Sequence, residues 1–182
     1  VLDGRAATEK ALKSQPLRSF SVLHLAVHGV ADSKFPDRSA LVFGSDAAAH
    51  EDGLLQVREI ESLPLNADLV TLSACDTGAG RIQGQEGVAN IVRAFLYAGS
   101  RSIVSTLWEV DDTFTAALMK RFYANLAAGR DVSDALRLAK LEMRRRLGPN
   151  ATPYFWGPFT VVGDGLTRIQ FGPQGRGDKP RN

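Results

Sequence analysis

The sequence predicts a three-layer α/β sandwich, in which helices cover both faces of a mostly parallel sheet. Three observations predict this class. Short apolar runs alternate with longer helical patterns, the runs are apolar almost throughout, and 44% of the 182 residues are hydrophobic. Strands of a parallel sheet are buried on both faces, so they show continuous apolar character instead of alternation. A chain of this length buries about 70% of its unfolded surface, which is enough for one core.

Short apolar segments rich in strand-forming residues are expected to form the sheet. Each is bounded by turn residues or by a helical pattern, as Gly29 bounds the first one. A shorter run at 40–43 is expected to add a small extra strand. The four main segments are residues 20–27, 68–74, 101–107 and 158–162.

Helical patterns fill the intervals between these strands. The clearest one begins after a capping aspartate, Asp111 or Asp112, and ends near residue 128, just before a glycine. Its phenylalanine and leucine residues recur every four positions from 114 to 126, which gives one buried stripe. The other expected helices cover residues 5–13, 57–63, 86–98 and 132–147.

Charge and composition limit the classes of partner. The 22 basic and 20 acidic residues leave a net charge of +2. Residues 168–182 carry +3 of it, and residues 1–167 therefore carry −1. This distribution does not indicate a nucleic-acid surface. We expect a folded domain over 1–167 and a flexible basic tail over 168–182.

Several features indicate a cytoplasmic protein that does not enter a membrane. Cys75 is the one cysteine, so no intramolecular disulfide can form, and a reducing compartment is expected. No apolar run approaches the roughly 18 residues of a membrane helix, and no signal peptide is recognisable. Because the chain begins with Val1 instead of Met, we expect it to be a piece of a longer protein.

Two residues capable of nucleophilic catalysis follow the first two main strands. His28 ends the first predicted strand and Cys75 ends the second. Carboxyl ends of neighbouring parallel strands meet at one edge of a sheet, where ligands bind in open α/β folds. An imidazole beside a thiol can accept its proton and expose a thiolate. The backbone N–H groups of Gly29 and Cys75 could stabilise an oxyanion there.

Each of these residues also has a structural interpretation. A lone cysteine in an apolar strand is usually a small buried hydrophobe, although Cys75 precedes a glycine-rich turn instead of lying within the strand. A histidine in such a strand is often structural, and His24 fits that role better than His28. With three histidines and one cysteine in the chain, no metal site is expected. The glycines at 78–87 lack a phosphate-binding signature, so we expect no cofactor.

The segments LAVHG at 25–29 and LSACDTG at 72–78 resemble the two signature segments of the CHAT domain, a family of the caspase–separase group of cysteine peptidases. The 47-residue separation of His28 and Cys75 fits the caspase-type arrangement. Further similar blocks extend the resemblance over residues 2–164. One departure is GQEG at 84–87, where many relatives have GGEG.

The resemblance implies a caspase-like three-layer α/β/α sandwich and a cysteine endopeptidase. In it, His28 is the general base, Cys75 is the nucleophile, and the N–H groups of Gly29 and Cys75 form the oxyanion hole. It also implies a protein or peptide substrate. Such domains usually end a larger bacterial chain, often after tetratricopeptide repeats, so an upstream repeat domain or a regulatory protein is the expected partner.

Other polar and aromatic residues near the expected edge are candidates for substrate binding. They are Asp76, Glu86, Trp108 and Asp111. Each has an alternative: Trp108 could be a core residue, Asp111 a helix cap, and the two acidic residues a cap and a solvated charge.

Two other functions are compatible with the same residues. One is a catalytically silent signalling or scaffold module of the same fold. The other is a thiol hydrolase that acts on a small ester or thioester.

Overall fold

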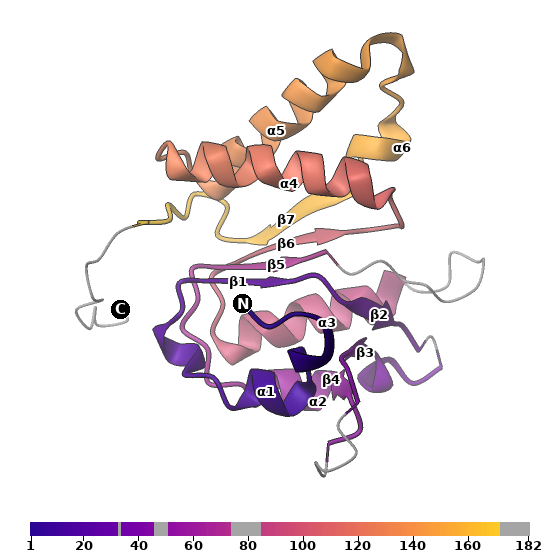
Figure 1. Cartoon of the computed structure of the whole chain (residues 1–182), viewed down its shortest axis with the longest axis vertical. Coiled ribbons are helices and arrows are strands. Elements are labelled where there is room, and N and C mark those ends of the chain that lie inside the picture. Colours follow the sequence, from indigo (N-terminus) through magenta and orange to yellow (C-terminus); the bar gives the residue numbers. More distant parts are fainter. Residues whose placement is uncertain (33, 46–50, 74–84, 172–182) are drawn as a thin grey trace.

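The computed structural model describes residues 1–32, 34–45, 51–73 and 85–171. Within this part, four strands form a central sheet in the order β1-β5-β6-β7, and helices cover both of its faces (Figure 1). The strands are β1 Val22–Leu25, β5 Leu69–Leu72, β6 Ser102–Thr106 and β7 Phe159–Gly163. The first three are parallel and β7 is antiparallel to β6. The predicted three-layer sandwich with a mostly parallel sheet is confirmed.

The helices form the outer layers (Figure 1). On one face lie α4 and α5, and on the other face lie α1, α2 and α3. Short 3-10 turns at Gly4–Ala6, Leu17–Ser19, Pro36–Arg38 (η3) and Gly148–Asn150 connect the elements. The α-helices are α1 Glu9–Lys13, α2 Val57–Glu61, α3 Gln85–Ala98, α4 Asp112–Ala127, α5 Val132–Leu147 and α6 Pro153–Trp156.

The apolar strands supply two hydrophobic cores, one on each face of the sheet. Successive side chains along a strand point to opposite faces. Accordingly, Leu69 and Val104 pack with α4 and α5, while Val70 and Ile103 pack in the other core with residues of α2 and α3. This double burial explains why β5 and β6 are apolar almost throughout.

A second sheet, which the sequence did not predict, holds the first candidate residue. It contains β2 His28–Val30, β3 Ala40–Val42 and β4 Leu54–Gln56, all antiparallel. The prediction of a single strand over 20–27 that ends at His28 is wrong. The chain leaves the central sheet after Leu25, and His28 begins β2 opposite Val42. The place of His28 in β2 depends on its pairing with Val42, which lies 14 residues later in the chain, and no local pattern indicates such a pairing.

The expected helix at 5–13 is shorter than predicted. The side chain of Thr8 accepts a hydrogen bond from the amide of Ala11 at 3.1 Å and caps α1, which therefore begins at Glu9. The aromatic segment before the last strand forms the one-turn helix α6.

The chain after β7 returns to the body of the molecule before the described part ends. The backbone of Arg168 forms an isolated antiparallel β-bridge with Asp131, at the N-terminus of α5. Ile169 is buried in the core beneath α4 and α5. Residues 172–182 of the expected tail lie outside the described part.

The stripe of α4 should supply a large share of the stability. Leu118 is completely buried, so Leu118→Ala is expected to lower the free energy of unfolding by about 2–5 kcal/mol. Lys120 is exposed on the same helix, and Lys120→Ala should change it by less than about 0.5 kcal/mol. Urea denaturation of both variants measures the difference, and equal effects would contradict this arrangement of the core.

Candidate active site

Three parallel strands end at one level of the central sheet. Leu25 of β1 lies opposite Leu72 of β5, and Leu72 lies opposite Ser105 of β6. The amide of Ser73 donates to the carbonyl of Leu25 at 3.0 Å, so β1 and β5 remain paired to their last residues. The segments that follow these strands therefore start from the same edge, which is the usual ligand-binding edge of an α/β sheet.

His28 lies three residues beyond Leu25 and its side chain is exposed. Its strand, β2, lies near the end of the central sheet at which β1 terminates (Figure 1). Because a strand directs alternate side chains to opposite faces, His28 and Val30 are exposed while Gly29 between them is buried. The imidazole of His28 is therefore accessible to solvent.

Gly29 lines a small pocket between the two sheets. Its lining includes residues at the carboxyl ends of β5 and β6, and its volume is about 20 Å³. Described residues around it are mostly apolar, and none is charged: Val30, Ala31, Leu41, Leu72, Val88, Ile91, Ser105 and Thr106. Gly29 thus lies next to the carboxyl edge of the central sheet.

Trp108 and Asp111 both follow β6, at the same edge. The indole Nε1 of Trp108 donates to the carbonyl of Tyr154 at 3.0 Å, and 39% of the residue is exposed. Asp111 is exposed and accepts the amide of Phe114 at 2.8 Å, which caps α4. The structure therefore shows the helix-cap interpretation of Asp111 directly, whereas Trp108 is anchored at one end and open to solvent.

Three predicted site residues cannot be placed. Cys75 and Asp76 lie outside the described residues. Glu86 belongs to α3, but its side chain is likewise outside the described part. The roles given to these residues stay predictions.

His24 has the structural role that the sequence favoured for it. Its Nδ1 lies 2.9 Å from the hydroxyl of Tyr123, which in turn donates to Oγ1 of Thr71 at 2.9 Å. This chain of polar contacts connects β1, α4 and β5. Desolvation lowers the pKa of His24 below its usual value, which favours the neutral imidazole.

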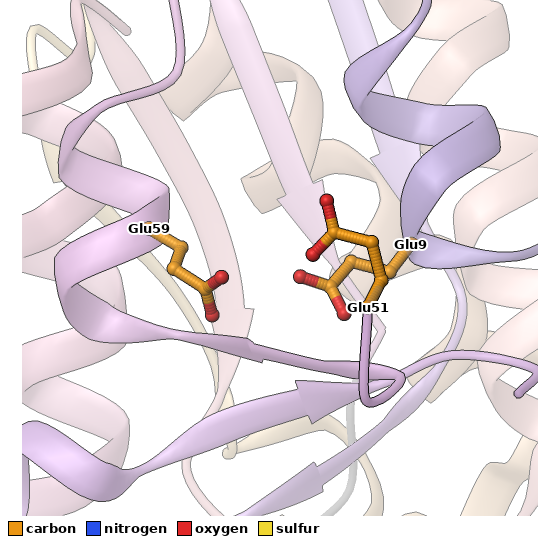
Figure 2. Close-up of side chains that lie close together, drawn as sticks. All are labelled: Glu9, Glu51 and Glu59. Carbon is orange, nitrogen blue, oxygen red and sulfur yellow. The ribbon is translucent and has the colours of Figure 1, made fainter. Parts of the chain in front are cut away.

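A cluster of carboxylates is the main polar group that the sequence did not predict. Carboxylate oxygens of Glu9, Glu51 and Glu59 lie within 4.8 Å of one another, as Figure 2 shows. Only the spacing of Glu9 and Lys13, four residues apart on one helix, is visible locally. The other two glutamates arrive from the segment around β4 and from α2, which no short-range pattern indicates.

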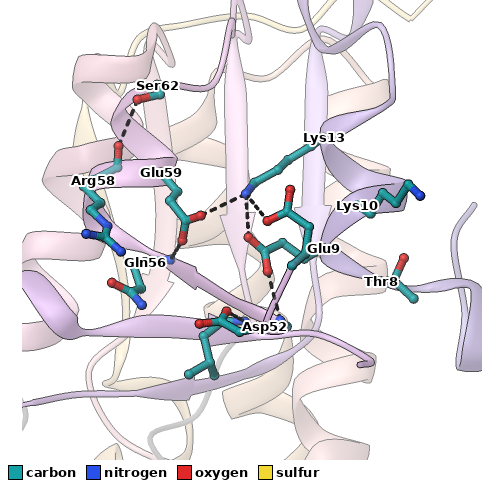
Figure 3. Close-up of polar contacts among 12 residues, drawn as sticks. Thr8, Glu9, Lys10, Lys13, Asp52, Gln56, Arg58, Glu59 and Ser62 are labelled. Atoms are coloured by element: carbon teal, nitrogen blue, oxygen red, sulfur yellow. Dashed lines mark hydrogen bonds and ion pairs between the residues drawn. The ribbon is translucent and has the colours of Figure 1, made fainter. Parts of the chain in front are cut away.

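The ammonium of Lys13 occupies the centre of this cluster (Figure 3). Its Nζ lies 2.6 Å from Glu9, 2.8 Å from Glu51 and 2.9 Å from Glu59. The buried Glu9 also accepts the amide of Gly53 at 3.0 Å. Lys13 already takes the position of a cation, so the cluster is an ion-pair network that joins α1 to α2 and to the segment before β4.

Comparison with known proteins decides the family. The chain matches the CHAT domain family over residues 1–164. The chain belongs to the CHAT domain family. It is thus a caspase-like, peptidase-related domain, in agreement with the mixed α/β fold and the mostly parallel sheet.

Curated relatives of this CHAT domain are long proteins. Tetratricopeptide repeat protein 28 of the mouse is 29% identical over 119 residues, which are 65% of this chain and 5% of that protein. Its human counterpart is 27% identical over the same length and the same shares. The chain thus spans about one twentieth of these relatives, and their names bear out the association of this domain with tetratricopeptide repeats.

Among the described residues, no helix of the CHAT domain has the length and apolar character needed to cross a membrane.

The contacts of Glu59 predict a pH-dependent contribution to stability. Burial raises the pKa of this carboxyl, but hydrogen bonds from the Gln56 amide and from Lys13 outweigh burial, so its pKa lies below the usual value. A carboxyl whose pKa is lower in the folded state than in the unfolded state stabilises the fold at pH values above its unfolded-state pKa. This stabilisation is lost as the pH falls through the folded-state pKa. Glu59→Gln should therefore lower the free energy of unfolding by about 1 kcal/mol above about pH 5, and by progressively less in acid.

Urea unfolding of the wild type and Glu59→Gln from pH 7 to pH 3 measures this difference. Glu61→Gln is the matched control, since Glu61 is exposed on the same helix. A cost that stays constant over this pH range would contradict the ion-pair assignment.

Proposed function

We propose that this CHAT domain is a cysteine endopeptidase in which Cys75 is the nucleophile and His28 is the general base. Family membership supports the reaction class. The observation that carries the residue assignment is the hydrogen bond between the Ser73 amide and the Leu25 carbonyl. Cys75 follows Ser73 by two residues and His28 follows Leu25 by three, so the chain can bring both groups to the same edge.

The proposed reaction needs only these two side chains and water. His28 accepts the thiol proton, and the thiolate of Cys75 attacks the scissile carbonyl carbon. The C–N bond then breaks as the protonated imidazole returns its proton to the leaving amine, and a thioester to the acyl portion remains. Water attacks the thioester, His28 accepts its proton, and the carboxylic acid leaves as the thiol is restored.

The remaining predicted residues are assigned to oxyanion and substrate binding. Backbone N–H groups of Gly29 and Cys75 are proposed to hold the oxyanion, where one such donor is typically worth about 3–4 kcal/mol. Trp108 is proposed to contact the substrate, since its partly exposed ring follows β6 at the same edge. Asp76, Glu86 and Asp111 are proposed as secondary contacts, and for Asp111 this role is additional to its observed cap.

The proposed substrate is a protein or peptide in the cytoplasm. Support for the compartment is the single cysteine, which suits a reducing environment. The repeats named in the relatives support a regulatory partner that binds through such repeats and acts on this domain. In that case cleavage depends on the partner as well as on the two catalytic groups.

The reactivity of Cys75 tests the proposed pair directly, because alkylation of this chain can modify no other thiol. The pH profile of alkylation by iodoacetamide should show a pKa well below that of a free thiol, about 8.5. His28→Ala should move the profile back towards that value, whereas His24→Ala should leave it unchanged. A profile that His28→Ala does not alter removes His28 as the base.

Cleavage itself is tested with a peptide library, analysed by mass spectrometry. The library is incubated with the domain alone and with the domain plus any polypeptide that is encoded before residue 1. Cleavage should disappear in Cys75→Ala and fall about 10²–10⁴-fold in His28→Ala. If no cleavage depends on Cys75 in either condition, the domain is a silent signalling or scaffold module instead of a peptidase.

A further inference from the structure

Helix α3 is the element that joins the two sheets. Ala94 and Phe95 of α3 are fully buried in a core that also contains Leu72 of β5, Ile103 of β6 and Leu41 of β3. The same helix also contacts η3, the turn between β2 and β3. The position of β2 relative to the central sheet therefore depends on how the N-terminal turn of α3 contacts the β2–β3 connection.

At that turn, the backbone of Gly87 lies against the connection with no room for a side chain. A Cβ atom at this position would lie 2.7 Å from Cβ of Ala31, 2.7 Å from Oγ of Ser39 and 3.0 Å from Cα of Ala31. Real Cβ atoms essentially never approach other atoms so closely. Neither neighbour can yield without a local rearrangement, since Cβ of Ala31 is bonded directly to the backbone and Ser39 is a short, completely buried side chain.

The two neighbours are the residues that flank the strand bearing His28 and its partner strand. Ala31 directly follows β2 and Ser39 directly precedes β3. Oγ of Ser39 accepts the amide of Asp32 at 3.1 Å, and the carbonyl of Ser39 accepts the amide of Val57 at 3.2 Å. The contact with Gly87 therefore reaches the base of the β2–β3 pair, which is itself hydrogen-bonded to the start of α2.

Local preference does not explain a glycine at this position. Glycine inside a helix is about 1 kcal/mol less favourable than alanine. Gly87 lies in the first turn of α3, and its φ is not in the left-handed region that would require glycine. Close packing against Ala31 and Ser39 is the feature that excludes a larger residue.

We propose that Gly87 is a positioning residue for His28: by letting α3 pack directly on Ala31 and Ser39, it sets where β2 places the imidazole at the carboxyl edge of the sheet. This rests on the proposed function in one respect, the role of His28 as the base. Packing of α3 on the β2–β3 connection can be measured independently of that role.

Alkylation of Cys75 in Gly87→Ala is the first measurement. The rate at pH 7 should fall at least tenfold, and the pH profile should move towards that of His28→Ala, because a displaced imidazole no longer accepts the thiol proton. Ala89→Gly is the matched control: Ala89 is exposed two residues further along α3, and this change weakens the helix without altering the contact. It should leave the profile unchanged.

Hydrogen exchange at the Asp32 amide is the second measurement, because it reports the contact without reference to catalysis. Gly87→Ala should accelerate this exchange, since the added methyl must displace Oγ of Ser39. The double variant with Ala31→Gly should restore part of the protection and part of the alkylation rate. If Gly87→Ala does not fold, Ala31→Ser enlarges the same contact by one atom and should show both changes.

The outcomes separate the two proposals. If His28→Ala alters the alkylation profile and Gly87→Ala does not, the positioning role is overturned and the catalytic pair stands. If His28→Ala has no effect, the catalytic pair fails, and with it the role of Gly87 in positioning a base. Unchanged Asp32 exchange in Gly87→Ala would overturn the packing argument itself.

Discussion

Parallel pairing of β5 with β1 on one side and with β6 on the other is the constraint on which the rest of this structure depends. The register places Leu25, Leu72 and Ser105 at one level, so three connecting segments leave the sheet at the same edge. Because both faces of these strands are covered by helices, the edge is the part of the sheet that a substrate can reach. Every predicted catalytic residue belongs to a segment that begins there.

The small antiparallel sheet determines where His28 lies relative to this edge. It takes the chain out of the central sheet after Leu25 and presents His28 on an exposed strand instead of at the end of a buried one. A histidine on a separate sheet is accessible, but its position relative to the central sheet then depends on the packing between the two sheets. Helix α3 contributes to that packing, since its residues lie in the core that the two sheets share, and the proposed role of Gly87 rests on this contact.

Polar contacts hold the elements that surround this edge. Lys13 joins α1 to α2 and to the segment before β4, and Tyr123 connects α4 to His24 and Thr71. Ion pairs with a buried partner are costly to break, since the remaining charge loses its solvation without compensation. These contacts lie on opposite sides of the central sheet. Their role is to hold the surrounding helices and strands in place, and the proposed reaction does not use them.

The sequence by itself determined the layers, the main strands, most helices and the family resemblance. It could do so because burial on two faces leaves a continuous apolar pattern, and because stripes and caps are local features of a helix. It also indicated that Asp111 could cap α4, which the structure confirms, while the site roles of His28 and Trp108 stay predictions. Only the tertiary structure decided that His28 begins an antiparallel strand, that three glutamates surround Lys13, and that Gly87 touches Ala31 and Ser39. These depend on atoms brought together from distant parts of the chain, and no local pattern records which distant segments will meet.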